Sequence, residues 1–400
     1  MPLKLLKFLK TKEYLVTINR WLLTVLFLVF SVSFANAQVI PPSADVPEPV
    51  QPPQQTILPI GGYSSDYGLY GGGFYQRISF SEQTLPFSSE FSFDFLLSTR
   101  GDLMSQMQYQ RLQTFGKPIR SNLHIEGERR RQSGYFGIGN NTVFEESLFD
   151  DGFYDFDRRT FFLEYQARRQ LTNKSYLGQI DTFGLVSFAY GDGVVRNEES
   201  LFNQERPQGF GSGWVNKLGV GFITDSRDSE YIPTEGVRHE IGISNSNRFL
   251  GSSYSLSTLN ADFRHHTKLL PGVVLAHRLS LEHILGTAPY WDLAIIGNKF
   301  GLRGFHENRF RGNSSVLSML ELRSWLFSFW ENQIGVGVQG FWDTGRVFTE
   351  QDSNRFFDDW KQSFGGGIAI SLFDPSLIIR ADIGISDESS RFYFGTGYIF

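Results

Sequence analysis

The chain has 400 residues, of which 16% are aromatic, 40% hydrophobic and 20% charged, with 41 glycines and a formal net charge of −5. Because no basic surplus is available to neutralise phosphates, this balance excludes a typical nucleic-acid-binding protein. The lack of cysteine excludes disulfides, thiolate metal sites, cysteine catalysis and a lipid anchor at a cleavage-site cysteine. No stretch after residue 40 approaches the roughly eighteen consecutive apolar residues of a transmembrane helix, which excludes a helical membrane bundle.

The first segment has the three parts of a secretory signal peptide. Residues 2–20 are rich in lysine, residues 21–30 form an apolar run, and Ala35-Asn36-Ala37 provides small residues for cleavage. A retained membrane anchor is the alternative, but the apolar run is short for a span. We therefore predict a signal peptide over 1–37. A proline-rich leader follows over 38–56, and its prolines favour an extended, polyproline-like chain.

From residue 57 onward, apolar and polar residues alternate. The alternation is clearest in 91–98, 161–168, 333–343 and 376–386. Side chains alternate across a strand, so each segment is predicted to be a strand with one apolar and one polar face. A soluble β-sandwich would alternate too, but several segments are about twice as long as the roughly six residues usual there. Because backbone groups in lipid must all be paired, the pattern predicts an all-β fold, a transmembrane antiparallel β-barrel of the outer membrane.

Counting the alternating segments gives about sixteen strands, an even number as in bacterial single-chain barrels. The start of the first strand is open between residues 57 and 66. With the first strand starting at the periplasmic side, all the long connections are extracellular and the tight turns are periplasmic, which is the usual asymmetry of outer-membrane barrels. The long connections are 133–158, 192–212, 287–313 and 347–360. The predicted strands are 57–64, 68–80, 89–100, 104–115, 120–132, 159–171, 178–191, 213–225, 236–246, 252–267, 272–286, 314–327, 333–346, 361–373, 376–386 and 391–400.

Several motifs resemble those of the BamA/TamA family, the bacterial surface antigen barrels of the outer membrane protein 85 superfamily. Gly301-Leu302-Arg303-Gly304-Phe305 is similar to the (V/L)-R-G-(F/Y) motif of a loop that folds back into the barrel. Phe341-Trp342-Asp343-Thr344-Gly345 is similar to the F-x-D-x-G motif of the thirteenth strand, and Leu320-Glu321-Leu322-Arg323 resembles the E-L-R strand before it. The segment from Asp225 to Gly236 resembles the family's D-x-R-D…P-T-x-G periplasmic turn. The resemblance covers roughly 57–400.

The resemblance implies a lock between the long loop and the inner wall. Strand parity points Glu321 and Asp343 inward on neighbouring strands. In the family the loop arginine enters the lumen and pairs with such acids, so Arg303 is expected to hold both carboxylates with its planar guanidinium. Gly304 would allow a turn where a Cβ would clash, and Phe305 would pack against the inner wall. The alternative is an exposed Arg303 and two ordinary wall residues.

A second candidate site is the turn that resembles the family's periplasmic motif. Its acids could suggest calcium, but a role in stabilising the turn is favoured. The turn residues are Asp225, Arg227, Asp228, Pro233 and Gly236.

The last predicted strand is the third candidate site. Parity puts its aromatic residues on the lipid face, and the resemblance implies that this pattern is the signal read by the machinery that assembles the barrel. Gly395 and Gly397 lie on the other face, where they weaken the strand or make room for the inserted loop. The signal residues are Phe392, Phe394, Tyr398 and Phe400.

No catalytic, cofactor or metal motif stands out, so the sequence predicts no enzyme, no cofactor and no metal. The resemblance implies a role in protein insertion, export or transport at the outer membrane, and the alternative is a passive pore or structural surface antigen. The interval between residues 38 and 57 leaves no room for a POTRA module, so we expect a short member of the family. The expected partners are outer-membrane lipid, the barrel-assembly machinery and a separate periplasmic POTRA-like or cargo protein, with no nucleic acid.

Overall fold

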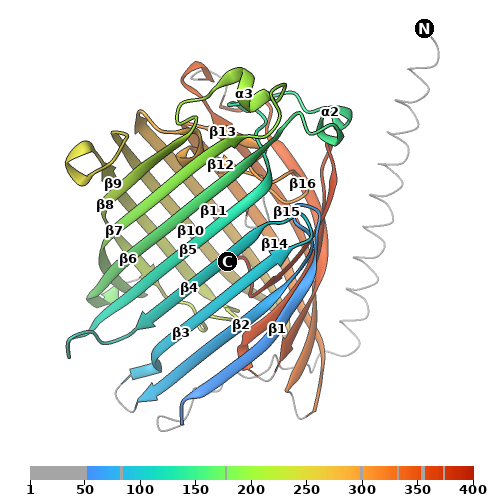
Figure 1. Ribbon diagram of the computed structural model, residues 1–400. Helices are drawn as coiled ribbons and strands as arrows, with labels where there is room; N and C mark the ends of the chain where they lie inside the picture. Colours follow the sequence, from blue (N-terminus) through green and yellow to red (C-terminus); the bar gives the residue numbers. More distant parts are fainter. Residues whose placement is uncertain are drawn as a thin grey trace.

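The computed structural model describes residues 52–81, 84–175, 178–297, 301–330, 333–352, 356–372 and 374–400. The predicted signal peptide and most of the predicted leader lie outside these residues. Sixteen strands form one sheet in which each strand pairs with the next along the barrel, and the sheet curves into a nearly closed barrel (Figure 1). The predicted all-β class and strand number are confirmed.

Every ladder in the barrel sheet is antiparallel. The barrel strands are β1 (Gln54–Ser64), β2 (Gly68–Ser81), β3 (Thr84–Ser98), β4 (Leu103–Arg111), β5 (Ile119–Gly134), β6 (Asp155–Ser175), β7 (Gly178–Val195), β8 (Ser212–Asp225), β9 (Gly236–Ser246), β10 (Leu256–Leu270), β11 (Val273–Gly286), β14 (Ser314–Phe329), β15 (Ile334–Phe348), β16 (Lys361–Leu372), β17 (Asp374–Ile385) and β18 (Ser390–Thr396).

Most strand boundaries lie within a few residues of the prediction, and the differences have local causes. β1 begins at Gln54, so the first strand takes in the end of the predicted leader and pairs with β2 along its whole length. β10 begins at Leu256 rather than 252, because Asn247 caps a short 3₁₀ turn, Arg248–Leu250, in the connection before it. β6 and β7 are longer than predicted because they continue to pair as far as Phe156 and Val195.

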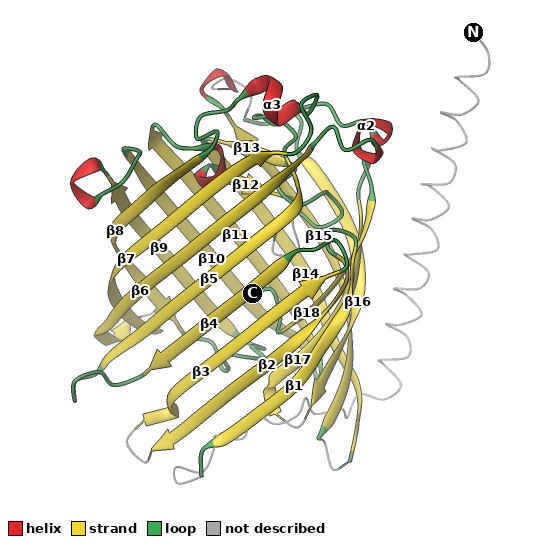
Figure 2. Cartoon of the chain, in the orientation of Figure 1, coloured by secondary structure: helices red, strands yellow, loops and turns green. Residues whose placement is uncertain are grey.

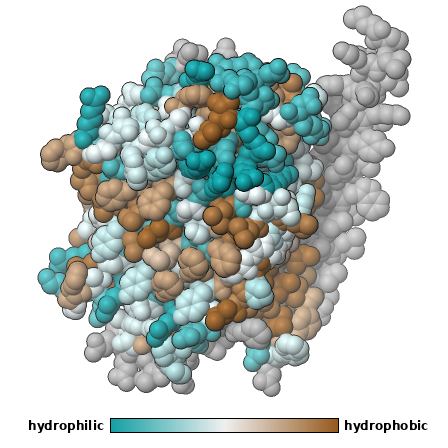
Figure 3. Space-filling view, in the orientation of Figure 1, coloured by the Kyte–Doolittle hydropathy of each residue, from teal (hydrophilic) through white to brown (hydrophobic). Residues whose placement is uncertain are grey.

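The outer face of the barrel is apolar, as the alternation predicts. On β3, for example, Phe93, Phe95 and Leu97 are exposed on this face, while the residues between them turn inward. In Figure 3, hydrophobic side chains gather across the middle and lower part of the face in view, whereas hydrophilic ones gather towards the end that carries the helices. Such an apolar band below a polar rim is the surface that a membrane-spanning barrel presents to lipid.

The long connections all lie at one end of the barrel (Figure 2). They carry the short helices α2 (Glu146–Asp150) and α3 (Leu201–Glu205) and a two-stranded sheet of β12 (Ala294–Ile296) and β13 (Phe310–Gly312). The sequence did not predict this small sheet within the 287–313 connection. None of the helices in the described residues has the length and apolar character needed to cross a membrane.

Candidate functional site

Arg303 lies inside the barrel, between the two acids that the sequence singled out. Its Nε and Nη2 donate to the two carboxylate oxygens of Asp343 on β15 at 2.6 and 2.7 Å, and its Nη1 donates to Glu321 on β14 at 2.7 Å. All three side chains are fully buried. The guanidinium also stacks on the ring of Phe341, 3.3 Å from its centroid. The structure thus brings the three predicted residues into one fork-shaped contact.

A second arginine balances the charge of this cluster. Arg323 on β14 donates to the other oxygen of Glu321 at 2.9 Å, so two guanidinium groups face two carboxylates. Burial alone would lower the pKa of Arg303, but Asp343 and Glu321 outweigh it and raise this pKa above its ordinary value. Arg303 therefore stays charged, and the paired charges tolerate an apolar surrounding that would expel an isolated one.

Gly304 fixes the loop directly after this contact. Gly304 has a φ of +89°, and a Cβ there would meet the backbone of Ile385 at 3.0 Å, so only glycine fits without strain. Its N–H donates to the Tyr393 hydroxyl on β18 at 2.9 Å. Its carbonyl accepts from Ser386 and Ser389 in the β17–β18 turn at 2.9 and 2.7 Å.

Phe305 belongs to a buried apolar cluster that fills the lumen next to the loop. The cluster joins loop residues to inward residues of β11, β14 and β15 and to the last residue of the chain. Its members are Ala276, Ile296, Leu302, Phe305, Phe310, Leu317, Met319, Val347 and Phe400.

The same loop contacts both edges of the barrel sheet. The Glu307 N–H donates to Asp66, in the β1–β2 connection, at 3.3 Å, and the Glu307 carboxylate pairs with Arg130 on β5. On the other edge, Arg391 on β18 donates to a ring nitrogen of His306 at 3.0 Å and pairs with Asp66. The loop therefore joins β18 to the connection that follows β1.

The two edge strands, β1 and β18, form no ladder in the described residues, and we call their junction the seam. One backbone bond crosses it, from the Ser65 N–H to the Phe392 carbonyl at 3.2 Å. Among the described residues, side chains add the Arg391–Asp66 ion pair and two further bonds, in which the Phe392 N–H donates to Ser65 Oγ at 3.0 Å and the Tyr70 hydroxyl donates to the Phe394 carbonyl at 3.2 Å. Elsewhere in the barrel, neighbouring strands share ladders of seven or more residue pairs. The seam is thus the weakest junction in the described sheet.

Residues 397–400 leave the wall at the seam and turn into the lumen. β18 ends at Thr396, and Gly397, with a φ of +71°, redirects the chain. Tyr398 packs on Trp325 and lies beneath the Arg323 guanidinium, while Phe400 is 4% exposed within the lumenal cluster. The expectation that Tyr398 and Phe400 face lipid is therefore wrong, because strand parity applies only while the strand continues. Phe392 does lie on the exposed outer face, 37% exposed, and Phe394 is partly exposed beside the seam.

A cavity of about 190 Å³ lies behind the seam, lined by residues of β1–β4, β17 and β18, among them Gln106 and Arg380.

A Cβ added at Gly395 or Gly397 would meet nothing within 4 Å. The suggestion that these glycines make room for the inserted loop is therefore wrong.

The predicted periplasmic turn is organised by its own acids. Asp225 accepts two bonds from the Arg227 guanidinium at 3.0 and 2.9 Å. Asp228 accepts from the N–H of Thr234 at 2.8 Å and from the Thr234 hydroxyl, and these bonds lower its pKa although burial alone would raise it. Pro233 is buried, and Gly236 has a φ of +101°. Among the residues described, no group of three or more acids and histidines is placed to hold a metal ion.

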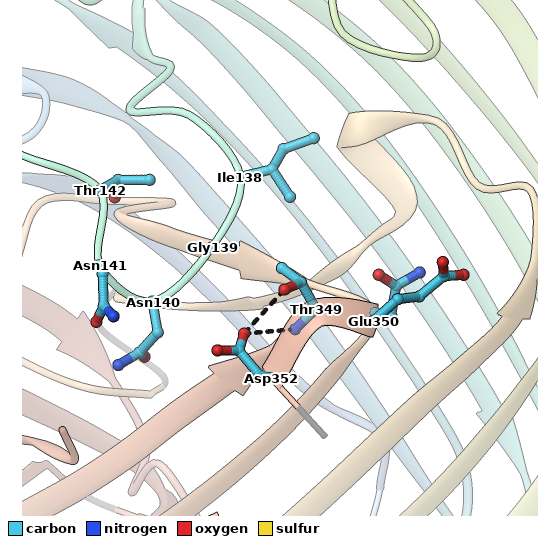
Figure 4. A pocket seen from close by; sticks show the side chains of 9 residues that line it. Ile138, Gly139, Asn140, Asn141, Thr142, Thr349, Glu350 and Asp352 are labelled. Atoms are coloured by element: carbon cyan, nitrogen blue, oxygen red, sulfur yellow. Dashed lines mark hydrogen bonds between the residues drawn. The ribbon is translucent and has the colours of Figure 1, made fainter. Parts of the chain in front are cut away.

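A larger polar cavity, of about 720 Å³, lies among the long connections (Figure 4). Asn140 donates to the Asp359 carbonyl at 2.7 Å and accepts from the Val347 N–H at 3.2 Å. Asp352 accepts from the N–H and hydroxyl of Thr349 at 3.0 and 2.8 Å, as the dashed lines show. These polar groups fasten the connections to one another.

Sequence reasoning missed the residues that tie the loop to the seam: Asp66, His306, Glu307, Ser386, Ser389, Arg391 and Tyr393. Parity alone could have placed Arg391 and Tyr393 on inward positions of the last strand. The others lie in connections, where alternation carries no information.

Comparison with known proteins identifies a family and similar solved structures for this barrel. A model described as the Omp85 superfamily domain matches residues 65–400. Among solved structures, the barrel is similar to BamA from Haemophilus ducreyi lacking POTRA domains 1–3, with 14% identity and a TM-score of 0.56 over 86% of this chain and 71% of that one. It is also similar to CdiB from Escherichia coli, with 10% identity and a TM-score of 0.57 over 90% of this chain and 67% of that one.

CdiB from Acinetobacter baumannii gives a TM-score of 0.50 at 13% identity, over 87% of this chain and 60% of that one. No curated protein matches the sequence. At such low identities the structural likeness shows the fold alone, while the family match covers most of the chain, including the loop, the inward acids and the last strand, β18. The chain belongs to the Omp85 superfamily.

Proposed function

We propose that this outer-membrane barrel inserts, exports or transports protein substrates, with the β1–β18 seam as its movable part. The long connections then lie outside the cell and the tight turns face the periplasm. The observation that carries the proposal is a contrast within the described part of the chain: one backbone bond crosses the seam, whereas the loop contacts both of its edges. An opening seam would expose unpaired strand edges, which can template a substrate strand.

The contents of the lumen favour this function over a passive pore. The part of the 287–313 connection that carries Arg303, Gly304 and Phe305, which we call the RGF loop, enters from the end of the long connections. Residues 397–400 enter from the wall, and the apolar side chains of the two segments pack together. A passive pore needs a continuous polar channel, whereas here buried aromatic residues occupy the lumen beside the Arg303 cluster.

The experiment is a comparison of the outer-membrane and secreted proteomes of native cells after depletion and rescue. One rescue variant, Ser65→Cys/Phe392→Cys, locks the seam with a disulfide at the point where the two backbones bond. A matched control, Tyr63→Cys/Leu69→Cys, links residues already paired in the β1–β2 ladder. The native chain has no cysteine to interfere.

We expect depletion to remove specific proteins from the outer membrane or medium. The control pair and the seam pair kept reduced should restore them, whereas the oxidised seam pair should not. Restoration by the oxidised seam pair would eliminate lateral opening. An unchanged proteome after depletion would eliminate the function itself. The passive-pore alternative predicts a steady, large conductance from purified protein in planar bilayers, and we expect none.

A further inference from the structure

The connection between β8 and β9, residues 226–235, folds into the barrel instead of away from it. Glu230 accepts two bonds from the guanidinium of Arg120 on β5 at 2.9 and 2.7 Å. The hydroxyl of Tyr231 donates to Glu90 on β3 at 3.2 Å. Glu90 points inward, since its neighbours Phe91 and Phe93 lie on the outer face.

The next residue of the connection reaches the opposite part of the inner wall. Ile232 is 6% exposed and packs in one buried cluster with Trp325 on β14, Ala369 on β16 and Ile378 on β17. Tyr398, in the segment that turns in from the seam, packs against the same cluster.

These contacts define a path across the barrel. β8 and β9 stand midway along the sixteen-strand sheet, so they lie opposite the seam, where the ends of the sheet meet. β3 and β17 stand close to the two sides of the seam. The connection therefore runs from one side of the lumen to the other, at the end of the tight turns.

The connection is stiff enough to act as one piece, because Asp228 holds the N–H groups of Thr234 and Glu235 at 2.8 and 3.2 Å. Its anchor differs from that of the RGF loop. The Arg303 contact has no exposed side chain, whereas the side chains of Arg120 and Glu230 are 21% and 33% exposed. Water can replace the Arg120–Glu230 contact, but it cannot reach the Arg303 contact.

We propose that residues 226–235 reversibly close the tight-turn end of the lumen, whereas the RGF loop remains fixed in the lumen. Release breaks the Arg120–Glu230 pair and withdraws Ile232 from its pocket, which opens the route to the cavity behind the seam.

The test uses Gln106→Cys, in that cavity, as a reporter in the cysteine-free chain. Opened outer membranes are treated with a bulky maleimide, and the labelling rate is measured. Release variants add Glu230→Gln or Ile232→Ser. The matched control is Glu235→Gln, which removes a charge from the exposed end of the same connection. We expect labelling to rise roughly fivefold in Glu230→Gln, the loss of a partly exposed pair, and more in Ile232→Ser, with no change in the control.

All variants are first checked for the heat-dependent gel shift of a folded barrel. Labelling of folded Glu230→Gln and Ile232→Ser at the wild-type rate would overturn the proposal. A second measurement is independent of the reporter: Ile232→Cys/Ala369→Cys should form a disulfide in native membranes under mild oxidation. Failure of that disulfide to form would mean that the connection does not cross the lumen.

Discussion

Arg391 on β18 and Asp66 after β1 form a buried ion pair between positions 325 residues apart in the sequence. The pair joins the two edges of the barrel sheet at the seam. Both partners also bind the RGF loop, Asp66 through the Glu307 N–H and Arg391 through His306. One ion pair therefore couples the closure of the barrel to the position of its lumenal loop.

Replacing Asp66 with Asn should weaken this closure. Removing one partner of a buried ion pair costs about 3–5 kcal/mol, because the remaining charge stays buried without compensation. Wild-type protein should keep a folded band on unboiled SDS gels, since all other strand junctions form ladders and the Asp66–Arg391 pair holds the seam, and Asp66→Asn should convert to the unfolded band at a lower temperature. Arg159→Ala, whose side chain is 48% exposed, is the control and should convert like wild type. If wild type, Asp66→Asn and Arg159→Ala convert at the same temperature, the Asp66–Arg391 pair has no role in closure.

The Arg303 contact should tolerate neither alanine nor lysine. Arg303 bonds two carboxylates through three different nitrogens, and an ammonium group cannot reproduce that fork. We expect protease added to intact cells to cut the 287–313 connection faster in both Arg303→Ala and Arg303→Lys. A lysine variant protected as well as wild type would show that charge alone holds the loop.

The parts of this structure that follow simple repeating constraints were predictable. Lipid outside and a polar lumen inside impose a period of two, so sixteen strands and their inward residues could be predicted from alternation. Glu321 and Asp343 follow from that parity. The pairing with Arg303 came from the resemblance of its motif, because parity does not extend into a long connection.

The remainder depends on the path of the chain where alternation ends. Phe400 was assigned to the lipid face on the assumption that the last strand continues, but a positive φ at Gly397 turns the chain inward. Likewise, the family-like turn motif predicted a local turn, and nothing in its residues indicates that Glu230 and Ile232 reach opposite walls. The Arg120–Glu230 contact joins residues 110 positions apart, and such contacts depend on barrel curvature.

The loop should loosen in acid because His306 is buried as a neutral ring. Burial, together with Arg391 and Arg309, lowers its pKa to about 3. A histidine with a lowered pKa stabilises the folded loop above its unfolded value of about 6.5, and that contribution is lost progressively as pH falls from there towards 3. Protonation also removes the ring acceptor that Arg391 uses.

We therefore expect the 287–313 connection of purified barrel to be cut faster by an acid-active protease as pH falls from about 6.5 to 4. His306→Gln should flatten that dependence, since glutamine keeps an acceptor but does not titrate. His283→Gln, at an exposed position on β11, should retain it. A pH dependence that survives in His306→Gln would assign the effect to other groups.

Phe400 should have two separable roles. In the finished barrel it packs with Leu302, Phe305 and Phe310, and Arg323 donates to its main-chain oxygen at 2.9 Å. Phe400→Ala should cost about 3–5 kcal/mol, as for other buried phenylalanines, and should speed cutting of the loop in refolded protein. Phe392→Ala, on the outer face, should not.

The assembly signal is tested separately, by the amount of newly made protein that reaches the cell surface. Because Phe400 ends inside the lumen, any recognition by the assembly machinery must come before the residue is buried there. We expect Phe400→Ala to lower surface levels in cells beyond what its loss of stability in refolded protein explains. Normal surface levels together with a loosened loop would leave Phe400 a packing residue only, and an unchanged loop would contradict the lumenal role.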